Sequence, residues 1–377
     1  MEEQLCWNFD SETSVFERER HIFYLEMMYQ LLPSPYQDQE INRLTLAYFV
    51  VSGLDILSAL DRIDKEVLIN WVLSLQAPPN NETPLENGNG FFYGFHGSRS
   101  SEFQSTDNRA AVLNGSHLAS TYCALAILKT VGYDLSLVDS ELLSASMKNL
   151  QQPDGWRWQN CGSNLSCLIC PSFMPIHTGG EADLRFVFCA AAICSMLKNW
   201  GGMDREKAKE YIIICQSYDG GFGLIPGSES HDVTGGATYC AVASLKLMGF
   251  LEEDLLLERA SCHIINVPLL LDWSLQKQAQ DGGIQGRVNK PTDTCYAFWI
   301  GGVLRILQAD KFLNKRALRG FLLTCQSKYG GFSKFPRLLP DLYHSYYGFC
   351  AFSLLKEPGL RFLCVELGIT DVAALGL

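Results

Sequence analysis

A glutamine followed by a glycine-rich turn recurs along this chain, and this internal repeat limits the possible folds more than any other feature. The repeats read LSLQAPPN, NLQQPDGW, CQSYDGGFG, KQAQDGGIQG and CQSKYGGF, with glutamines at Gln76, Gln151, Gln216, Gln278 and Gln326. Twelve residues before these glutamines stand Asp64, Asp139, Asp204, Asn266 and Asn314. Asp and Asn side chains cap the free amides of a first helical turn. Each repeat is therefore predicted to contain a capped helix of about 13 residues, ending in a turn.

A second helical segment follows each turn, and it is apolar on nearly every side. The segments are TYCALAILK, FVFCAAAICSML, TYCAVASLKLMG, TCYAFWIGGVLRIL and SYYGFCAFSLL, and TLAYFVVSGLDIL supplies a sixth. The outer partner of this sixth segment is expected near residues 16–32. Helices that are apolar all round are buried. Alternating amphipathic and buried helices predict an all-α fold, an α/α toroid of six hairpins in which outer helices surround inner ones.

The whole chain, residues 1–377, is expected to form this single domain. Two segments interrupt the repeat, and both are expected at the surface. Residues 77–110 are polar and rich in Asn, Ser and Gly, which is typical of a long loop. Residues 156–171 carry WRWQNCGSNLSCLICP, which has the character of an insertion. A shorter interruption, DVT, separates His231 from GGATYC.

The charge balance argues against nucleic acid as a partner. The chain has 30 basic and 41 acidic residues, a net charge of −11, so it lacks the basic surface that binds a phosphate backbone. The longest apolar stretch, residues 186–197, is shorter than the roughly 18 residues of a membrane span. The acidic start MEEQLCWNFD is no signal peptide. A soluble, cytoplasmic protein with reduced cysteines is expected.

Polar residues at the starts of inner helices should converge at one rim of the toroid. Asp293 and Cys295 open one inner helix in PTDTCYAFW, and His344 opens the next in DLYHSYYGF. Mixed oxygen, sulfur and nitrogen ligands suit zinc and leave a fourth position for a substrate. The alternative is that Cys295 is only a core residue, since Cys123, Cys189 and Cys240 occupy comparable places.

A basic cluster lies next to these residues. Arg287 and Lys290 precede Asp293, and Tyr296 follows it. A planar guanidinium, an ammonium and a phenol are suited to bind a diphosphate. His231 is expected to open another inner helix and so to reach the same rim. A solvated loop with ordinary charges, and a structural histidine, are the alternatives.

Aromatic residues also mark the inner helices: Tyr122, Phe188, Tyr239, Phe298 and Trp299. Most aromatics at helical spacing belong to a core. In a wide toroid they could instead line a funnel for a long hydrocarbon.

One other metal site is conceivable. Cys161, Cys167, Cys170 and His177 include a Cys-x-x-Cys pair, half of a common structural zinc site. The spacing of the remaining ligands is poor, so this site is disfavoured.

The motifs GRVNKPTDTCYAFW, ESH…GGATYC and PDLYHSYYGF, with the QxxDGGFxG turns, resemble the β subunits of the protein prenyltransferases from about residue 15 to 355. The resemblance implies a toroid that pairs with a helical α subunit and attaches an isoprenoid to a cysteine near a protein C-terminus. It implies one zinc ion held by Asp293, Cys295 and His344. It also places the diphosphate contacts on His231, Arg287, Lys290 and Tyr296.

Two positions favour the type I geranylgeranyl branch of this family. Farnesyl-transferring relatives have a tryptophan at the pocket floor where this chain has Thr45, and the smaller residue leaves room for five more carbons. They also have an aspartate associated with magnesium where this chain has Lys334, whose ammonium can replace the charge of the metal. The resemblance therefore implies geranylgeranyl diphosphate as lipid donor, no magnesium requirement, and an isoprenoid site that includes Tyr122, Phe188 and Trp299.

The family contacts for the acceptor C-terminus fall on His117, Ala119 and Phe186, with Arg185 near the terminal carboxylate. These residues suit leucine, which implies acceptors with a C-terminal CaaX motif, such as small GTPases of the Rho and Rac type. Tyr343 follows the farnesyl pattern, so a farnesyltransferase β subunit is one alternative.

Two alternatives come from other functional classes. A terpene cyclase on the same toroid would need an acidic DxDD-type motif, and residues 61–64, DRID, match it poorly. A noncatalytic toroid would not need Asp293, Cys295 and His344 together.

Overall fold

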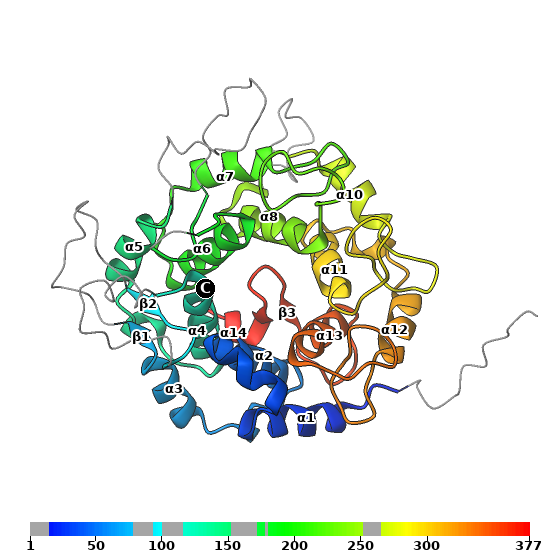
Figure 1. The fold of residues 1–377 in the computed structure, drawn as a ribbon, viewed down its shortest axis with the longest axis horizontal. Helices are drawn as coiled ribbons and strands as arrows, with labels where there is room; N and C mark the ends of the chain where they lie inside the picture. Colours follow the sequence, from blue (N-terminus) through cyan, green and yellow to red (C-terminus); the bar gives the residue numbers. More distant parts are fainter. Residues whose placement is uncertain (1–14, 78–92, 100–115, 152–171, 178–179, 252–264) are drawn as a thin grey trace, which may run out of the picture.

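Two concentric rings of helices surround a central opening (Figure 1). The computed structural model describes residues 15–77, 93–99, 116–151, 172–177, 180–251 and 265–377. The inner helices are α2 (Arg43–Ile56), α4 (Leu118–Thr130), α6 (Leu184–Leu197), α8 (Gly235–Leu247), α11 (Tyr296–Ile306) and α13 (Leu342–Leu354). The outer helices are α1 (Arg18–Gln30), α3 (Lys65–Leu73), α5 (Ser140–Lys148), α7 (Arg205–Ile214), α10 (Val267–Leu275) and α12 (Lys315–Thr324). The predicted all-α toroid of six hairpins is confirmed.

The predicted caps begin the outer helices from α3 onwards. Each cap side chain accepts a hydrogen bond from the backbone amide three residues later, as Asp64 does from Val67 at 3.1 Å. The same bond is made by Asp139, Asp204, Asn266 and Asn314. These helices have 9 or 10 residues, fewer than predicted, because the residues before each glutamine form a closing turn.

Three of the repeated glutamines, Gln151, Gln216 and Gln278, each join one repeat to the next. A glutamine side chain pairs with both the backbone N–H and the backbone carbonyl of the residue that caps the following outer helix. Gln216, for example, accepts from the amide of Asn266 at 2.9 Å and donates to its carbonyl at 3.2 Å. Gln151 and Gln278 bind Asp204 and Asn314 in the same way.

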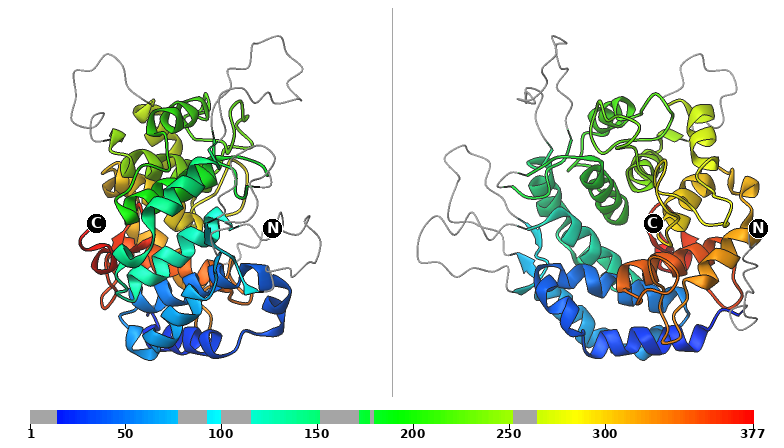
Figure 2. Two further views of the ribbon diagram at one scale, coloured as in Figure 1. Left: turned by 90° about the vertical axis from the view of Figure 1, so that its left-hand side faces the viewer. Right: turned by 45° about the vertical axis from the view of Figure 1, so that its right-hand side comes forward.

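The last glutamine closes the ring. Gln326 accepts from the amide of Glu17, the residue before α1, and donates to the carbonyl of Val15. His21 of α1 accepts from the amide of Gly331 at 2.9 Å and donates to Gln326 at 3.0 Å. Figure 2 shows the blue first helix beside the orange segment of the last repeat.

Inner helices form the core because their side chains are buried on nearly every side. On α4, for example, only Ala119 and Lys129 are not fully buried. Each inner helix contacts its neighbours, and α13 contacts α2, so the inner ring is closed as well. The three cysteines expected in the core, Cys123, Cys189 and Cys240, are buried and free.

The chain ends in a small hairpin inside the ring. Strands β3 (Leu363–Cys364) and β4 (Ile369–Thr370) pair antiparallel, and the short helix α14 (Asp371–Ala374) follows. In Figure 1 this red segment lies across the central opening. Asp55 of α2, which is 1% exposed, anchors it by pairing with Arg361 and accepting from Thr370 Oγ1 at 2.5 Å.

Part of the predicted surface loop at 77–110 is buried. Strand β2 (Gly94–Phe95) pairs with β1 (Gln76–Ala77), and Phe95 is fully buried. The apolar FFYGF motif explains this difference, because its second half supplies a core residue. The other described short elements are the 3-10 helices η2 (Ser34–Asn42), η3 (Leu60–Arg62), η6 (Leu135–Leu137) and η7 (Asp310–Phe312). The predicted insertion at 156–171 lies outside the described residues.

Among the helices of the described ranges, none combines the length and the apolar character needed to cross a membrane.

Candidate metal centre and surrounding site

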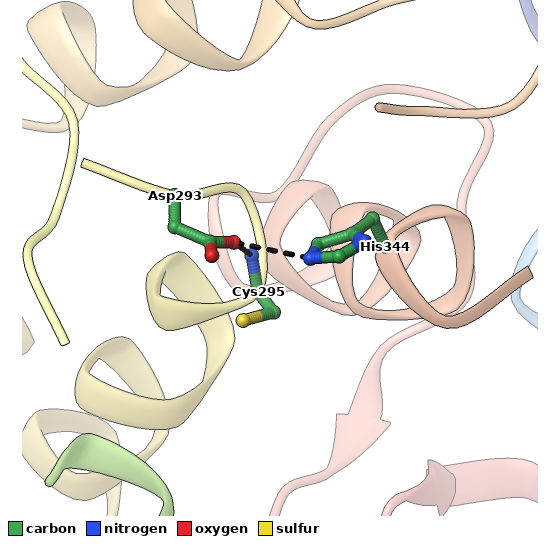
Figure 3. A group of neighbouring side chains, drawn as sticks. All are labelled: Asp293, Cys295 and His344. Carbon is green, nitrogen blue, oxygen red and sulfur yellow. Dashed lines mark hydrogen bonds and ion pairs between the residues drawn. The ribbon is translucent and has the colours of Figure 1, made fainter. Parts of the chain in front are cut away.

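Asp293, Cys295 and His344 meet at the N-terminal ends of two neighbouring inner helices (Figure 3). Asp293 lies two residues before the cap of α11, Cys295 is that cap, and His344 lies in the first turn of α13. Their ligand atoms all lie within 4.8 Å of one another. The sequence prediction that these helix starts share one rim is confirmed for this group.

Local hydrogen bonds hold the side chains of Asp293 and His344 in place. Asp293 Oδ1 accepts from the backbone amide of Cys295 at 3.0 Å and lies 3.3 Å from His344 Nε2. The other ring nitrogen of His344, Nδ1, lies 2.6 Å from a carboxylate oxygen of Asp341, which caps α13. Asp341 therefore orients the ring so that Nε2 faces Asp293 and Cys295, as carboxylates do for metal-binding histidines.

The three groups have strongly altered proton affinities. Burial alone would raise the pKa of Asp293, but hydrogen bonds from His344 and the Cys295 amide lower it below its usual value. Burial opposes the charge on His344 as well, yet Asp293 and Asp341 raise its pKa to about 9. Burial and the Asp293 carboxylate raise the pKa of the Cys295 thiol. A metal ion at this position must displace the protons of His344 and Cys295.

This group fits zinc. A carboxylate oxygen, a thiolate and an imidazole nitrogen are its usual ligands, and three protein ligands leave a fourth position open. Tetrahedral bonds of about 2.0 to 2.3 Å separate neighbouring ligand atoms by roughly 3.5 Å, so only a small contraction from the observed spacing is needed. Asp293 and Cys295 are each 4% exposed, which shields the site from bulk water.

Lys334 lies at the edge of the metal group. Its Nζ is 3.7 Å from Asp293 Oδ2, and its side chain is 48% exposed. Thr294 fixes this loop beside α11, because its amide donates to the carbonyl of Lys334 and its hydroxyl to that of Ser333. The turn after the last repeat thus brings a positive charge to the metal ligands.

The expected diphosphate residues Arg287, Lys290 and Tyr296 flank the same helix start. Arg287 is partly buried and Lys290 is exposed. Burial raises the pKa of Tyr296 to about 12, so its hydroxyl remains a donor at neutral pH. Gly286 allows the Tyr296 ring to approach the chain, since a Cβ there would lie 2.0 Å from Tyr296 Cζ.

His231 does not open an inner helix as expected. Helix α8 begins at Gly235 with Thr234 as its cap, and Val233 is fully buried. These two residues belong to the DVT interruption, so the helix start and the core contact both fall after His231. The His231 side chain is 71% exposed and pairs with Glu229 at 3.5 Å and Asp232 at 3.3 Å, while its carbonyl accepts from Arg287 at 2.9 Å.

Aromatic rings form a continuous wall around the opening, and this wall includes Tyr122, Phe188 and Trp299. Ring centroids lie 5.5 Å apart for Tyr122 and Phe188, 5.5 Å for Phe188 and Tyr239, and 4.9 Å for Tyr239 and Trp299. Tyr347, Tyr346 and Tyr48 close the circuit back to Tyr122. We use "aromatic wall" for these seven residues.

Thr45 lies beside the aromatic wall. It is partly buried on α2, and its Oγ1 is 3.7 Å from the sulfur of Cys123, the residue after Tyr122. The small side chain therefore lies against α4, next to a member of the wall.

The residues expected to bind the acceptor C-terminus lie together at the starts of α4 and α6. His117 caps α4 by accepting from the amide of Ala119, and its ring lies 6.0 Å from that of Phe186. The guanidinium of Arg185 lies over the Phe186 ring at 5.5 Å and makes a two-pronged bond to Asp183.

Two further carboxylates, Asp341 and Asp183, shape the site and were not among the predicted residues. Both are helix caps, so an Asp three residues before His344 and another two before Arg185 were the available signals. For the disfavoured second zinc site, Cys161, Cys167 and Cys170 lie outside the described residues. His177 contacts the carbonyl of Ser146 at 2.9 Å.

Comparisons with known proteins agree with this geometry. Residues 16–370 match the family model of the prenyltransferase alpha-alpha toroid domain. The geranylgeranyl transferase type-1 subunit beta of Arabidopsis thaliana is 62% identical to this chain, and the match covers 97% of this chain and 92% of the Arabidopsis protein. The geranylgeranyl transferase type-1 subunit beta of Dictyostelium discoideum is 33% identical, over 96% of this chain and 97% of the Dictyostelium protein. A Candida albicans protein geranylgeranyltransferase-I structure, complexed with GGPP, has the same fold, with a TM-score of 0.79 and 23% identity over 95% and 97% of the two chains.

Proposed function

Because this chain belongs to the prenyltransferase alpha-alpha toroid family, we propose that it is the catalytic β subunit of a type I protein geranylgeranyltransferase. The enzyme would transfer a geranylgeranyl group from geranylgeranyl diphosphate to the cysteine thiol of proteins with a C-terminal CaaX motif. The observation that carries this proposal is the Asp293, Cys295 and His344 group at the rim, in a chain 62% identical to a type-1 subunit beta.

Zinc bound by these three residues would stabilise the thiolate of the acceptor cysteine, which is the nucleophile of the reaction. Asp341 holds the ring of His344 with Nε2 toward the metal position. The 4% exposure of Asp293 and Cys295 keeps competing water away from the thiolate.

The basic residues would stabilise the leaving diphosphate. Negative charge grows on the diphosphate as its bond to carbon breaks, and fixed donors aimed at such charge give large rate effects. Arg287, Lys290 and Tyr296 supply donors, and Lys334 adds an ammonium close to the metal ligands. His231 would join them only if its side chain leaves Glu229 and Asp232. Lys334 is the reason to expect a reaction that does not require magnesium.

The apolar residues would select the two substrates. The aromatic wall would offer an apolar surface to the isoprenoid, and the small Thr45, which lies against Cys123, would leave room for its last unit. His117, Ala119 and Phe186 would contact the last acceptor side chain, and Arg185 its carboxylate. This environment suits leucine, and hence cytoplasmic acceptors such as small GTPases of the Rho and Rac type.

The proposed enzyme is a heterodimer. The relatives from Arabidopsis and Dictyostelium are each named as a subunit beta, and the chain aligns with almost their full lengths. We infer that an α subunit completes the enzyme here too.

Alanine variants of the metal ligands test the proposal. In the purified heterodimer, Asp293→Ala, Cys295→Ala and His344→Ala should each abolish zinc binding and transfer to a CaaX peptide without preventing assembly, because each removes one of three ligands. Cys194→Ala, at another buried thiol, should keep zinc and activity. Zinc content by atomic absorption decides the matter. Full occupancy in any two of the three ligand variants would refute the metal assignment.

A further inference from the structure

Four tyrosines of the aromatic wall point their hydroxyls at the backbone of the C-terminal hairpin. Tyr48 lies 2.7 Å from the carbonyl of Gly368, and Tyr346 bonds the same carbonyl. Tyr122 donates to the carbonyl of Leu367 at 2.8 Å, and Tyr239 to that of Val365 at 2.6 Å. The four rings come from four different inner helices, so one hairpin ties together most of the ring.

These bonds satisfy four hydroxyls that would otherwise be buried polar atoms of the wall. The four tyrosines are between 1% and 8% exposed, and a buried hydroxyl without a partner is costly. Tyrosine rings whose hydroxyls are bonded elsewhere offer their apolar faces. With the hairpin in place, the four hydroxyls are directed into the hairpin, so the ring faces carry the apolar contacts of the wall.

The closest contacts converge on Gly368. Its φ is +67°, in the left-handed region that favours glycine. A Cβ there would lie 2.8 Å from the hydroxyl of Tyr48, 3.0 Å from that of Tyr122 and 3.2 Å from that of Tyr346. Any side chain at this position must push these rings away from the hairpin.

The anchoring of the hairpin is equally specific. Asp55 binds Arg361 before the hairpin and Thr370 at its end, and the amide of Arg361 donates to the carbonyl of Ile56 at 2.8 Å. Both ends of the segment are thus fixed to α2, the helix that also carries Thr45 and Tyr48.

We propose that the hairpin of residues 363–370 is a positioning element of the lipid site, and that Gly368 is a specificity-determining position. This inference rests on the proposed function. The hairpin fixes the orientation of the rings on which the isoprenoid would pack. Displaced rings would intrude on the end of the proposed lipid site, and a 20-carbon chain extends further along that site than a 15-carbon chain. A longer lipid should therefore lose more affinity than a shorter one.

The test compares Gly368→Ala with Gly132→Ala in the zinc-loaded heterodimer. Gly132 has a φ of +86°, and a Cβ there would have no atom within 4 Å. An alanine at this position therefore introduces a backbone strain similar to that of Gly368→Ala, but no contact with a neighbouring side chain. Affinities for geranylgeranyl and farnesyl diphosphates are measured by isothermal titration. In Gly368→Ala the affinity for the 20-carbon lipid, relative to the affinity for the 15-carbon lipid, should fall about tenfold. A steric clash at an over-packed site lowers affinity by about this factor. The control should keep the wild-type ratio, and both should keep their zinc.

Near-ultraviolet circular dichroism gives a second measurement that needs no lipid, because it reports fixed aromatic packing. Gly368→Ala should alter the tyrosine signal, and Gly132→Ala should not. If the wild-type protein binds neither lipid, the proposed function is wrong. The spectrum then tests by itself whether Gly368 and the hairpin fix the positions of the aromatic rings. A Gly368→Ala protein that matches the control in spectrum, or in lipid ratio where wild type binds lipid, would overturn the inference.

A second pair of variants covers the case in which Gly368→Ala does not fold. Tyr239→Phe keeps the ring and removes the bond to Val365. Tyr211→Phe, on the outer helix α7, likewise keeps the ring and removes a buried hydroxyl that does not contact the hairpin but lies 3.5 Å from the carbonyl of Ala182 and 3.4 Å from that of Leu224. The first should weaken 20-carbon binding relative to 15-carbon binding, and the second should leave that ratio unchanged. Equal behaviour of the two would also contradict the inference.

Discussion

Without a bound metal, His344 and Cys295 both hold a proton at neutral pH. Two carboxylates surround the histidine and keep its pKa at about 9 despite burial, and the thiol is buried beside one of them. Asp293, with its lowered pKa, is already ionised. The residues proposed to bind zinc therefore also make binding compete with protons.

Zinc affinity should consequently rise steeply with pH. Binding releases two protons, one from each of His344 and Cys295, so the dissociation constant should fall about a hundredfold per unit between roughly pH 6 and pH 8. Competition with a chromogenic chelator, corrected for protonation of the chelator, measures this slope. A dissociation constant that does not change over this range would show that these two groups are not both ligands.

The position of Lys334 predicts that the transfer reaction does not require magnesium. Wild-type transfer should be nearly indifferent to magnesium, since an ammonium already stands 3.7 Å from Asp293. Lys334→Asp should lower the single-turnover rate by about a hundredfold without magnesium, as removal of one charge-stabilising donor does. Millimolar magnesium should restore much of that rate, because carboxylate and diphosphate oxygens form the hard site this ion prefers.

The control for this prediction is Lys334→Ala, which loses the charge but gains no carboxylate. It should be slow with or without magnesium. A wild type that needs magnesium, or a Lys334→Asp protein that ignores it, would place Lys334 outside the reaction.

At the scale of the helices, each repeat depends on its neighbour. Gln151, Gln216 and Gln278 each bind the backbone of the residue that caps the next outer helix, and at the ring closure His21 joins this arrangement. His21 is fully buried and uses both ring nitrogens. It accepts through Nδ1 from Gly331, so a proton on that nitrogen would break the closure.

Stability should therefore fall in acid. Burial lowers the pKa of His21 to about 4, below its ordinary value of 6.5. Between these values the unfolded chain takes up a proton that the folded chain refuses, so stability is complete above about pH 6.5 and declines as the pH falls toward 4. The loss from this group is about 3 kcal/mol. Urea unfolding of wild type and His21→Gln measures it, and an equal pH dependence in both would contradict the role of His21.

Local patterns predicted the elements well. Asp64 and the other caps act on amides three residues away, so their spacing is visible in the sequence. Asp293, Cys295 and His344 could be predicted to meet because neighbouring inner helices start at one rim. The contact of Gln326 with Glu17 joins residues 309 positions apart, and no local pattern shows it. His231 was misplaced because Val233 and Thr234 determine where α8 begins.

At the scale of the molecule, the toroid brings separate chemical groups to one rim. The proposed metal ligands come from the starts of α11 and α13, the proposed acceptor contacts from those of α4 and α6, and the aromatic wall from further along the inner helices. The C-terminal hairpin crosses the opening and bonds the wall. A lipid bound along the wall with its diphosphate at the basic residues would present its reactive carbon near the metal.

Lipid choice by the zinc-loaded heterodimer tests this account most directly. Single-turnover transfer of 20-carbon and 15-carbon diphosphates to a peptide ending in Cys-a-a-Leu should favour the 20-carbon lipid. Thr45→Trp should shift the preference toward the 15-carbon lipid by one to two decades, because over-packing costs roughly 1 to 3 kcal/mol. A wild type that transfers neither lipid, or a Thr45→Trp protein with the wild-type ratio, would contradict the account.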